Sequence, residues 1–175
     1  MKVKTVINER FQDYRKPSLF IATAMCDWKC CVDAGRKPAM CQNSPIAQLP
    51  TVDISEEEVF QRYVSDPITQ AIVIGGLEPL LQQDEVLSLI DYFRSHGCLD
   101  DIVIYTGYYR HEVLPFIDRL CVYENIIVKF GRFIPYRNKR YDAVLGVELA
   151  SDNQYAERID YPLPIRPSRT PIKSS

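Results

Sequence analysis

The chain has 175 residues, of which 46% are hydrophobic and 25% are charged, and its formal net charge is −2. This charge gives no electrostatic reason to expect a nucleic-acid or anionic-membrane partner. No apolar run approaches the ~20 residues of a membrane span, and the first residues carry charges where a signal peptide needs an apolar block. We therefore expect a cytoplasmic protein, in which clustered cysteines bind metal more often than they form disulfides.

Strands are predicted wherever short apolar or β-branched runs end at a turn signal. Such runs predict four strands, over residues 18–25, 71–74, 102–105 and 125–129. Because helices of ten to fifteen residues separate them, the expected fold is α/β with a mostly parallel sheet. The length favours one domain, over residues 1–161, followed by a Pro-rich tail over residues 162–175.

Three helices are expected between these strands. The first begins after Ser55, which is a suitable N-cap followed by three glutamates. The second is expected to begin at an Asp84 cap and to stop at Gly97. The third is predicted over residues 110–120, with Pro115 as an irregularity inside it.

Four of the six cysteines lie within sixteen positions directly after the first predicted strand: Cys26, Cys30, Cys31 and Cys41. A thiolate-rich loop favours zinc or an iron–sulfur cluster over hard cations. Cys26, Cys30 and Cys41 can place three thiolates on a four-iron cluster, which leaves one iron open to a substrate or cofactor. Two alternatives stay open: all four cysteines form a closed zinc site, or they are buried structural residues.

A glycine-rich turn follows the strand predicted over residues 71–74, with the sequence Gly75-Gly76-Leu77-Glu78-Pro79. Paired glycines let the backbone come close to a ligand, and Glu78 adds an acceptor. Ligands of parallel α/β folds bind at the carboxyl ends of the strands. We therefore expect the cysteine loop, this turn and residues 106–108 to share one rim of the sheet.

Taken in this order, the motifs resemble those of the radical S-adenosylmethionine (SAM) superfamily, and within it the activating proteins of anaerobic ribonucleotide reductase. Cys26, Cys30 and Cys41 look like the thiols of the CxxxCxxC motif. Residues 75–79 are similar to the Gly-Gly-Glu-Pro motif that holds the amine of SAM. Further segments resemble parts of the activases, so that the likeness covers roughly residues 5–160: they are residues 105–108, 131–133 and 150–159.

The chain departs from the family pattern at three places. Ten residues separate Cys30 from Cys41 where the family has two, so Cys31 is an extra thiol that could replace Cys30 as a ligand. Leu77 interrupts the Gly-Gly-Glu-Pro motif, and Phe130 stands where the activases usually have Asp before the glycine. These departures bear on the substrate more than on the cofactors.

The resemblance implies an incomplete βα barrel of radical SAM type and an oxidoreductase that cleaves SAM reductively. It implies a [4Fe-4S] cluster on Cys26, Cys30 and Cys41, without catalytic side chains beyond these ligands. The residues that would contact SAM are Met40, Gly75, Gly76, Glu78 and Thr106.

The implied partners are a glycyl radical enzyme, anaerobic ribonucleoside-triphosphate reductase, and a flavodoxin-like or ferredoxin-like electron donor. The reductase is the protein substrate that would receive the glycyl radical. Two other functions stay open: a radical SAM enzyme acting on a small molecule or peptide, similar to deazaguanine synthases, and a non-catalytic zinc-binding module.

Overall fold

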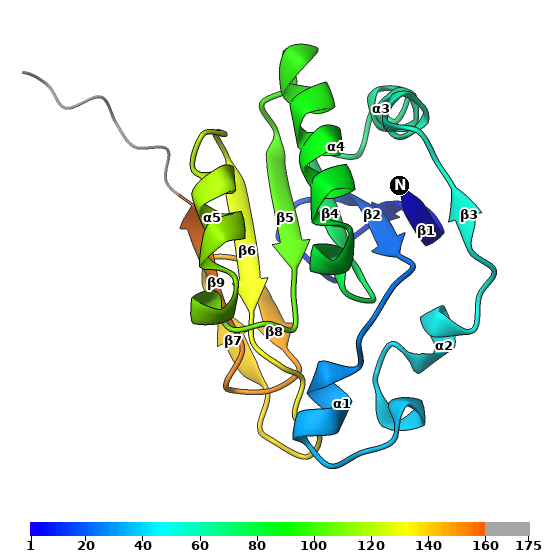
Figure 1. The fold of residues 1–175 in the computed structure, drawn as a ribbon. Coiled ribbons are helices and arrows are strands. Elements are labelled where there is room, and N and C mark those ends of the chain that lie inside the picture. Colours follow the sequence, from blue (N-terminus) through cyan, green and yellow to red (C-terminus); the bar gives the residue numbers. More distant parts are fainter. Residues whose placement is uncertain (160–175) are drawn as a thin grey trace, which may run out of the picture.

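The computed structural model describes residues 1–159, which form a mixed α/β fold around a seven-stranded sheet of order β3-β1-β2-β4-β5-β6-β9 (Figure 1). Four parallel strands occupy its centre, as predicted: β2 (Ser18–Thr23), β4 (Ala71–Gly76), β5 (Asp101–Tyr105) and β6 (Ile126–Phe130). Three antiparallel strands that the sequence patterns did not predict flank them: β1 (Lys2–Arg10), β3 (Val52–Asp53) and β9 (Tyr155–Ile159).

The sheet stays open within residues 1–159, where β3 and β9 form its two edges and do not pair with each other. Within the same residues, none of the helices combines the length and the apolar character that crossing a membrane requires. The predicted Pro-rich tail, residues 162–175, lies outside the described residues, as does the predicted domain boundary at residue 161.

Three helices cover one face of the sheet (Figure 1). The first, α3 (Glu56–Val64), begins as predicted with Ser55, whose side chain accepts from the Glu58 backbone N–H in a capping box. The second, α4 (Gln83–Ser95), follows a short 3₁₀ turn, η2 (Pro79–Gln82). Its N-cap is Gln82 and not Asp84. Asp84 lies in the first helical turn, where the electropositive end of the helix stabilises its negative charge.

The predicted helix over residues 110–120 is two elements, the 3₁₀ turn η3 (Arg110–Glu112) and α5 (Leu114–Leu120). Pro115 lies in the first turn of α5, where its missing N–H has no intrahelical partner to lose. The expected irregularity inside one helix is therefore a helix start.

Alternation along the central strands builds two cores, one on each face of the sheet. In β4, Ile72 and Ile74 pack against the helices, whereas Val73 belongs to the opposite core. The hairpin of β7 (Arg140–Asp142) and β8 (Val147–Leu149) contributes to that second core with the loop around Tyr14. Towards the carboxyl ends of the strands, the apolar residues of this second face are replaced by a cavity.

Candidate metal centre

Residues 26–43, which we call the cysteine segment, lie at the carboxyl ends of the central strands (Figure 1). The segment contains α1 (Lys29–Asp33) and the 3₁₀ turn η1 (Pro38–Met40), and α2 (Ser44–Ala47) follows it. A cavity of about 150 Å³ separates it from the strand ends. The cavity brings together the three predicted rim loops, since its lining includes Cys26, Cys30, Cys31, Cys41, Gly76, Glu78, Thr106 and Gly107.

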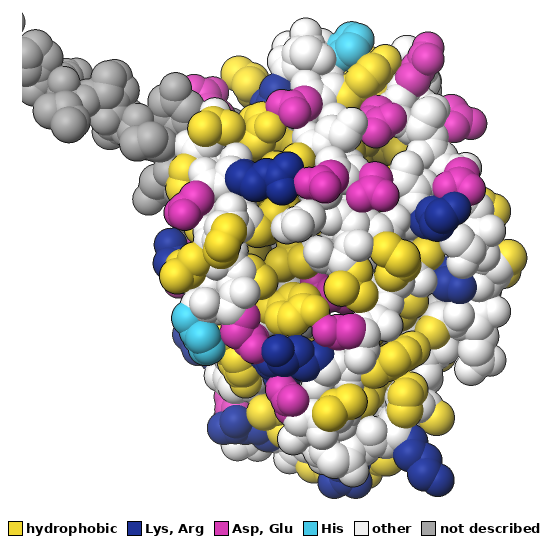
Figure 2. All heavy atoms as spheres, viewed as in Figure 1, with side chains coloured by type: hydrophobic (Ala, Val, Ile, Leu, Met, Phe, Trp, Pro, Cys, Tyr) yellow, Lys and Arg dark blue, Asp and Glu magenta, His cyan; other side chains and the backbone are white. Residues whose placement is uncertain are grey.

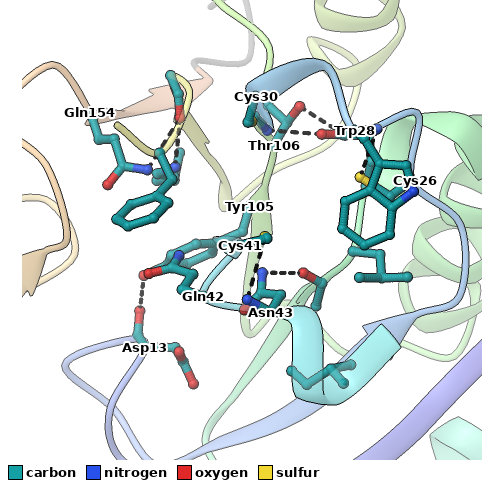
Figure 3. Close-up of a pocket in the computed structure, with 18 of the residues that line it drawn as sticks. Asp13, Cys26, Trp28, Cys30, Cys41, Gln42, Asn43, Tyr105, Thr106 and Gln154 are labelled. Atoms are coloured by element: carbon teal, nitrogen blue, oxygen red, sulfur yellow. Dashed lines mark hydrogen bonds between the residues drawn. The ribbon is translucent and has the colours of Figure 1, made fainter. Parts of the chain in front are cut away.

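Two of the cysteines accept hydrogen bonds from backbone N–H groups two residues further along the chain (Figure 3). The Trp28 N–H lies 3.2 Å from the Cys26 sulfur, and the Asn43 N–H lies 3.4 Å from the Cys41 sulfur. The Asn43 side chain also donates to the Gly76 carbonyl, which ties the end of the cysteine segment to β4. The local turns thus direct both sulfurs towards the cavity with donors beside them.

Cys30 reaches the same cavity from α1, and its position depends on Gly107. A Cβ atom at Gly107 would lie 2.7 Å from the Cys30 sulfur, closer than such atoms approach each other. Burial raises the pKa of the Cys30 thiol, and the backbone N–H of Phe133 and the ammonium of Lys129 oppose this effect. Gly107, which belongs to the predicted rim segment of residues 106–108, therefore makes room for a sulfur.

Cys31 differs from the other three cysteines in its surroundings. Its side chain is buried, and its thiol contacts the Cys41 thiol instead of a backbone donor. Burial raises the pKa of Cys31, and the neighbouring Cys41 and Cys30 thiols raise it further. Cys98 and Cys121 do not line this cavity.

Burial favours the protonated form of the Cys26 thiol beyond the ordinary preference of a cysteine at neutral pH. It raises the pKa of Cys26 to about 12, against the opposing effect of the Trp28 N–H. Because a metal binds the thiolate, binding at this cavity releases protons and depends on pH.

The glycine-rich turn reaches the cavity through Gly76 and Glu78, despite the extra Leu77. Gly76 has a φ of +80°, and a Cβ atom there would lie 2.7 Å from the Ala22 Cα, so only glycine fits. The Glu78 N–H donates to the Met25 carbonyl at 2.7 Å, which joins the turn to the start of the cysteine segment.

The Glu78 carboxylate is buried and accepts three hydrogen bonds from its surroundings. The donors are the Thr106 hydroxyl at 2.8 Å, the Gly107 N–H at 2.8 Å and the Leu80 N–H at 3.0 Å. Burial raises the pKa of Glu78, while these donors oppose the shift. Thr106, predicted to contact a cofactor, therefore holds Glu78 in place in this structure.

Two predicted contact residues lie beside the cavity and do not line it. Gly75 is one position further back in β4, where its carbonyl accepts from the Thr23 hydroxyl at 2.9 Å. Met40 is exposed and lines a smaller pocket together with Cys30, Cys31 and Cys41.

Lys129 and Tyr105 line the cavity but were not predicted as site residues. They are neighbours in the β5–β6 register, and the Lys129 ammonium lies 5.9 Å from the centre of the Tyr105 ring. Burial lowers the pKa of Lys129 to about 8, and nearby Cys30 and Glu78 oppose this shift. A lysine at the end of the apolar run Ile126–Phe130 was the sequence signal for this position.

An ion-pair network fixes the cysteine segment to the rest of the fold. The Arg132 guanidinium donates to both carboxylate oxygens of Glu112, at 2.5 and 2.7 Å, and also pairs with Asp33 in α1. Lys29, the first residue of α1, contacts Glu112 at 3.0 Å. This bidentate pairing lowers the pKa of Glu112 well below its usual range.

Figure 2 shows Lys and Arg side chains along the lower end of the molecule, where Figure 1 places α1.

The donors and the room at this site fit an iron–sulfur cluster. In the described part of the chain, no three Cys, His, Asp or Glu side chains surround a single point closely enough to hold one metal ion. A four-iron cluster presents its irons at separate corners, so its thiolates need not converge on one point. Thiols that line a common cavity and accept backbone N–H bonds are the arrangement that such a cluster requires.

Comparison with known proteins supports this fit. The chain has no significant match among curated proteins or solved structures. The family model described as a 4Fe-4S single cluster domain matches residues 19–154, well over half of the chain and all of the cavity's cysteines and strand ends. The chain therefore belongs to the 4Fe-4S single cluster domain family.

Proposed function

We propose that this protein is a radical SAM activase, which holds a [4Fe-4S] cluster and SAM in one cavity and installs a glycyl radical on a partner enzyme. The observation that carries the proposal is the cavity itself, where cysteine thiols face a buried glutamate at the end of a glycine-rich strand. Membership in a 4Fe-4S cluster family supports the cluster. The order of the motifs supports SAM and the finer description of the fold as a partial barrel of radical SAM type.

The proposed cluster ligands are Cys26, Cys30 and Cys41. Each of these sulfurs has a backbone N–H beside it, and such donors stabilise thiolates bound to iron. Cys31 has the Cys41 thiol as its neighbour instead, which supports a role outside the ligand set. With three protein ligands, a four-iron cluster would keep one iron available to SAM.

The residues around the cavity would bind and orient SAM. A reduced cluster, if bound here, would supply the electron for reductive cleavage of SAM, the chemistry that would remove a hydrogen atom from a glycine of the partner. Glu78, held rigid by Thr106 and Gly107, is suited to accept from the SAM amine. Gly76 and Phe20 also line the cavity, where Phe20 provides an apolar wall that would limit the access of water to bound SAM.

We propose anaerobic ribonucleoside-triphosphate reductase as the partner, on the strength of the motifs that resemble its activases. A flavodoxin-like or ferredoxin-like donor would supply the electron. Exposed basic residues of the cysteine segment, Arg36 and Lys37, would favour an acidic donor surface.

The test is to reconstitute the cluster under anoxic conditions and to add a reductant, SAM and a candidate reductase. We expect 5′-deoxyadenosine to form when the reductase is present, together with a glycyl radical detected by electron paramagnetic resonance. Product formation on a small molecule or peptide without a partner radical would instead identify the other kind of radical SAM enzyme. A colourless protein that contains zinc and does not bind SAM would reject both enzymes in favour of a binding module.

A further inference from the structure

Lys129 is a buried cation on the wall of the cavity, and it has no carboxylate partner among residues 1–159. Its side chain is only 6% exposed, and its ammonium donates one hydrogen bond, to the Gly131 carbonyl at 2.9 Å. Its direction follows from the alternation of β6, because Ile127, two positions earlier, packs in the second core. An ammonium has three donors, so two remain free to point into the cavity.

Glu78 provides the opposite charge in the same cavity. Its carboxylate accepts from Leu80, Thr106 and Gly107. Because an ionised carboxylate has about four acceptor positions, roughly one remains for a ligand. Both Glu78 and Lys129 line the cavity, yet the two residues form no ion pair with each other. The site therefore offers one acceptor and two donors that the protein leaves unused.

We propose that Lys129 binds the carboxylate of the amino-acid head of SAM, while the ammonium of that head donates to Glu78. The inference rests on the proposed function and adds the residue that recognises the acid group of the ligand. An α-amino acid carries an ammonium and a carboxylate on the same carbon, which matches the charges of this cavity. A buried ammonium with two unused donors is unfavourable until an anion accepts them.

Besides Glu78, the Cys30 thiol is a group near Lys129 that can carry a negative charge. A lysine that served only to offset cluster thiolates would change the iron content or the potential of the cluster. It would not distinguish between ligands with and without a carboxylate. Ligand discrimination, combined with iron analysis, therefore separates the two roles.

The experiment compares binding of SAM and of decarboxylated SAM to cluster-loaded protein in its oxidised state, by anoxic equilibrium dialysis. The variants are Lys129→Met, which is of similar length, and Lys129→Gln, which keeps a hydrogen-bond donor. The control is Lys139→Met, since Lys139 is exposed on the hairpin and pairs with Glu148 at 3.1 Å. We expect both Lys129 variants to bind SAM about 10- to 100-fold more weakly, with unchanged affinity for decarboxylated SAM.

Each other outcome overturns the assignment. Equal weakening of both ligands, or unchanged SAM affinity, rejects a contact between Lys129 and the carboxylate. Loss of iron in both Lys129 variants places the residue with the cluster ligands instead. Failure of the wild-type protein to bind SAM rejects the proposed function and this inference together, whereas wild-type binding with unaltered discrimination in the variants rejects the inference alone.

Discussion

The two ends of the central strands differ in how many partners the protein provides for a buried charged side chain. At the amino end of β5, the Asp101 carboxylate accepts from Lys16 at 2.6 Å, from Tyr14 at 3.0 Å and from Arg158 at 3.1 Å. At the carboxyl end of the neighbouring β6, the Lys129 ammonium has one hydrogen-bond partner among the described residues, the Gly131 carbonyl. One buried charge is fully compensated by the chain, and the other is not.

This difference separates a structural charge from a functional one. Burial raises the pKa of Asp101, but its cationic and hydroxyl partners outweigh that effect, so its pKa lies below the usual value. The amino end is therefore complete without a ligand and contributes to stability. At the carboxyl end, the thiols, Glu78 and Lys129 keep hydrogen-bonding or metal-binding capacity that the protein does not use, so a bound ligand would have to satisfy it.

The largest expected effect separates cluster binding from folding. Replacing Cys26, Cys30 or Cys41 singly with serine should abolish the cluster, because each removes one of the three proposed ligands, while the sheet remains folded. Iron and sulfide analysis and circular dichroism measure the two properties. Cys31→Ser is the matched control and should keep its iron. Loss of iron in Cys31→Ser with retention in Cys30→Ser would show that the neighbouring thiol is the ligand.

The reverse effect is expected at the amino end. Asp101→Asn should lower the free energy of unfolding by about 2 kcal/mol, because Lys16 and Arg158 lose a charged acceptor, and should leave the iron content unchanged. Urea denaturation measures the difference. As a control, Asp84→Asn removes an exposed pair with Arg119 and should cost less than about 1 kcal/mol. An iron-depleted Asp101→Asn protein would contradict the separation of the two ends.

Low pH should remove the contribution of Asp101 to the free energy of unfolding. Because its pKa is lowered in the folded protein, its stabilisation is present above the unfolded value of about 3.9 and is lost as the pH falls through the folded value. The wild-type protein and Asp101→Asn should therefore differ at pH 7 and converge below about pH 4. Melting temperatures across this range measure the convergence, and a difference independent of pH would show that charge is not the cause.

The smallest effect on stability is expected at Lys129. Without a ligand, Lys129→Met should be as stable as the wild-type protein, or more stable by about 1 kcal/mol, because it removes a buried charge that forms no direct ion pair. The Gly131 carbonyl keeps a donor in this variant, since the Gln154 side chain lies 3.2 Å from it. Urea denaturation of metal-free protein tests this, and a marked loss of stability would place Lys129 with Asp101 as a structural charge.

The central strands could be predicted because both of their faces are buried. Their sequences are therefore continuous apolar runs, such as residues 71–74. The strands β1 and β9 were not predicted, because both lie outside the apolar centre of the sheet and mix charged with apolar residues, as in Lys2-Val3-Lys4. Their place depends on pairing with β2 and β6, which no local pattern records.

The site divides in the same way. The cysteine segment and the Gly76–Glu78 turn are each local in sequence, so their spacing indicated a metal site at the strand ends. Lys129 was not identified, because its burial depends on neighbours from distant segments, such as Tyr105 across the β5–β6 register. Gly107 was predicted only as part of the rim segment of residues 106–108, since its proximity to the Cys30 sulfur exists only in the folded chain.

All four cavity thiols belong to one short stretch of the chain, whereas the sheet beside them combines strands from its whole described length. Because the described core of that sheet is apolar and contains no cysteine of the cavity other than Cys31, we expect the scaffold to fold without metal and to be loaded afterwards. Oxygen that destroys the inorganic core would then spare the polypeptide template. We expect a damaged molecule to be repaired by renewed delivery of iron and sulfide, without fresh synthesis of the chain.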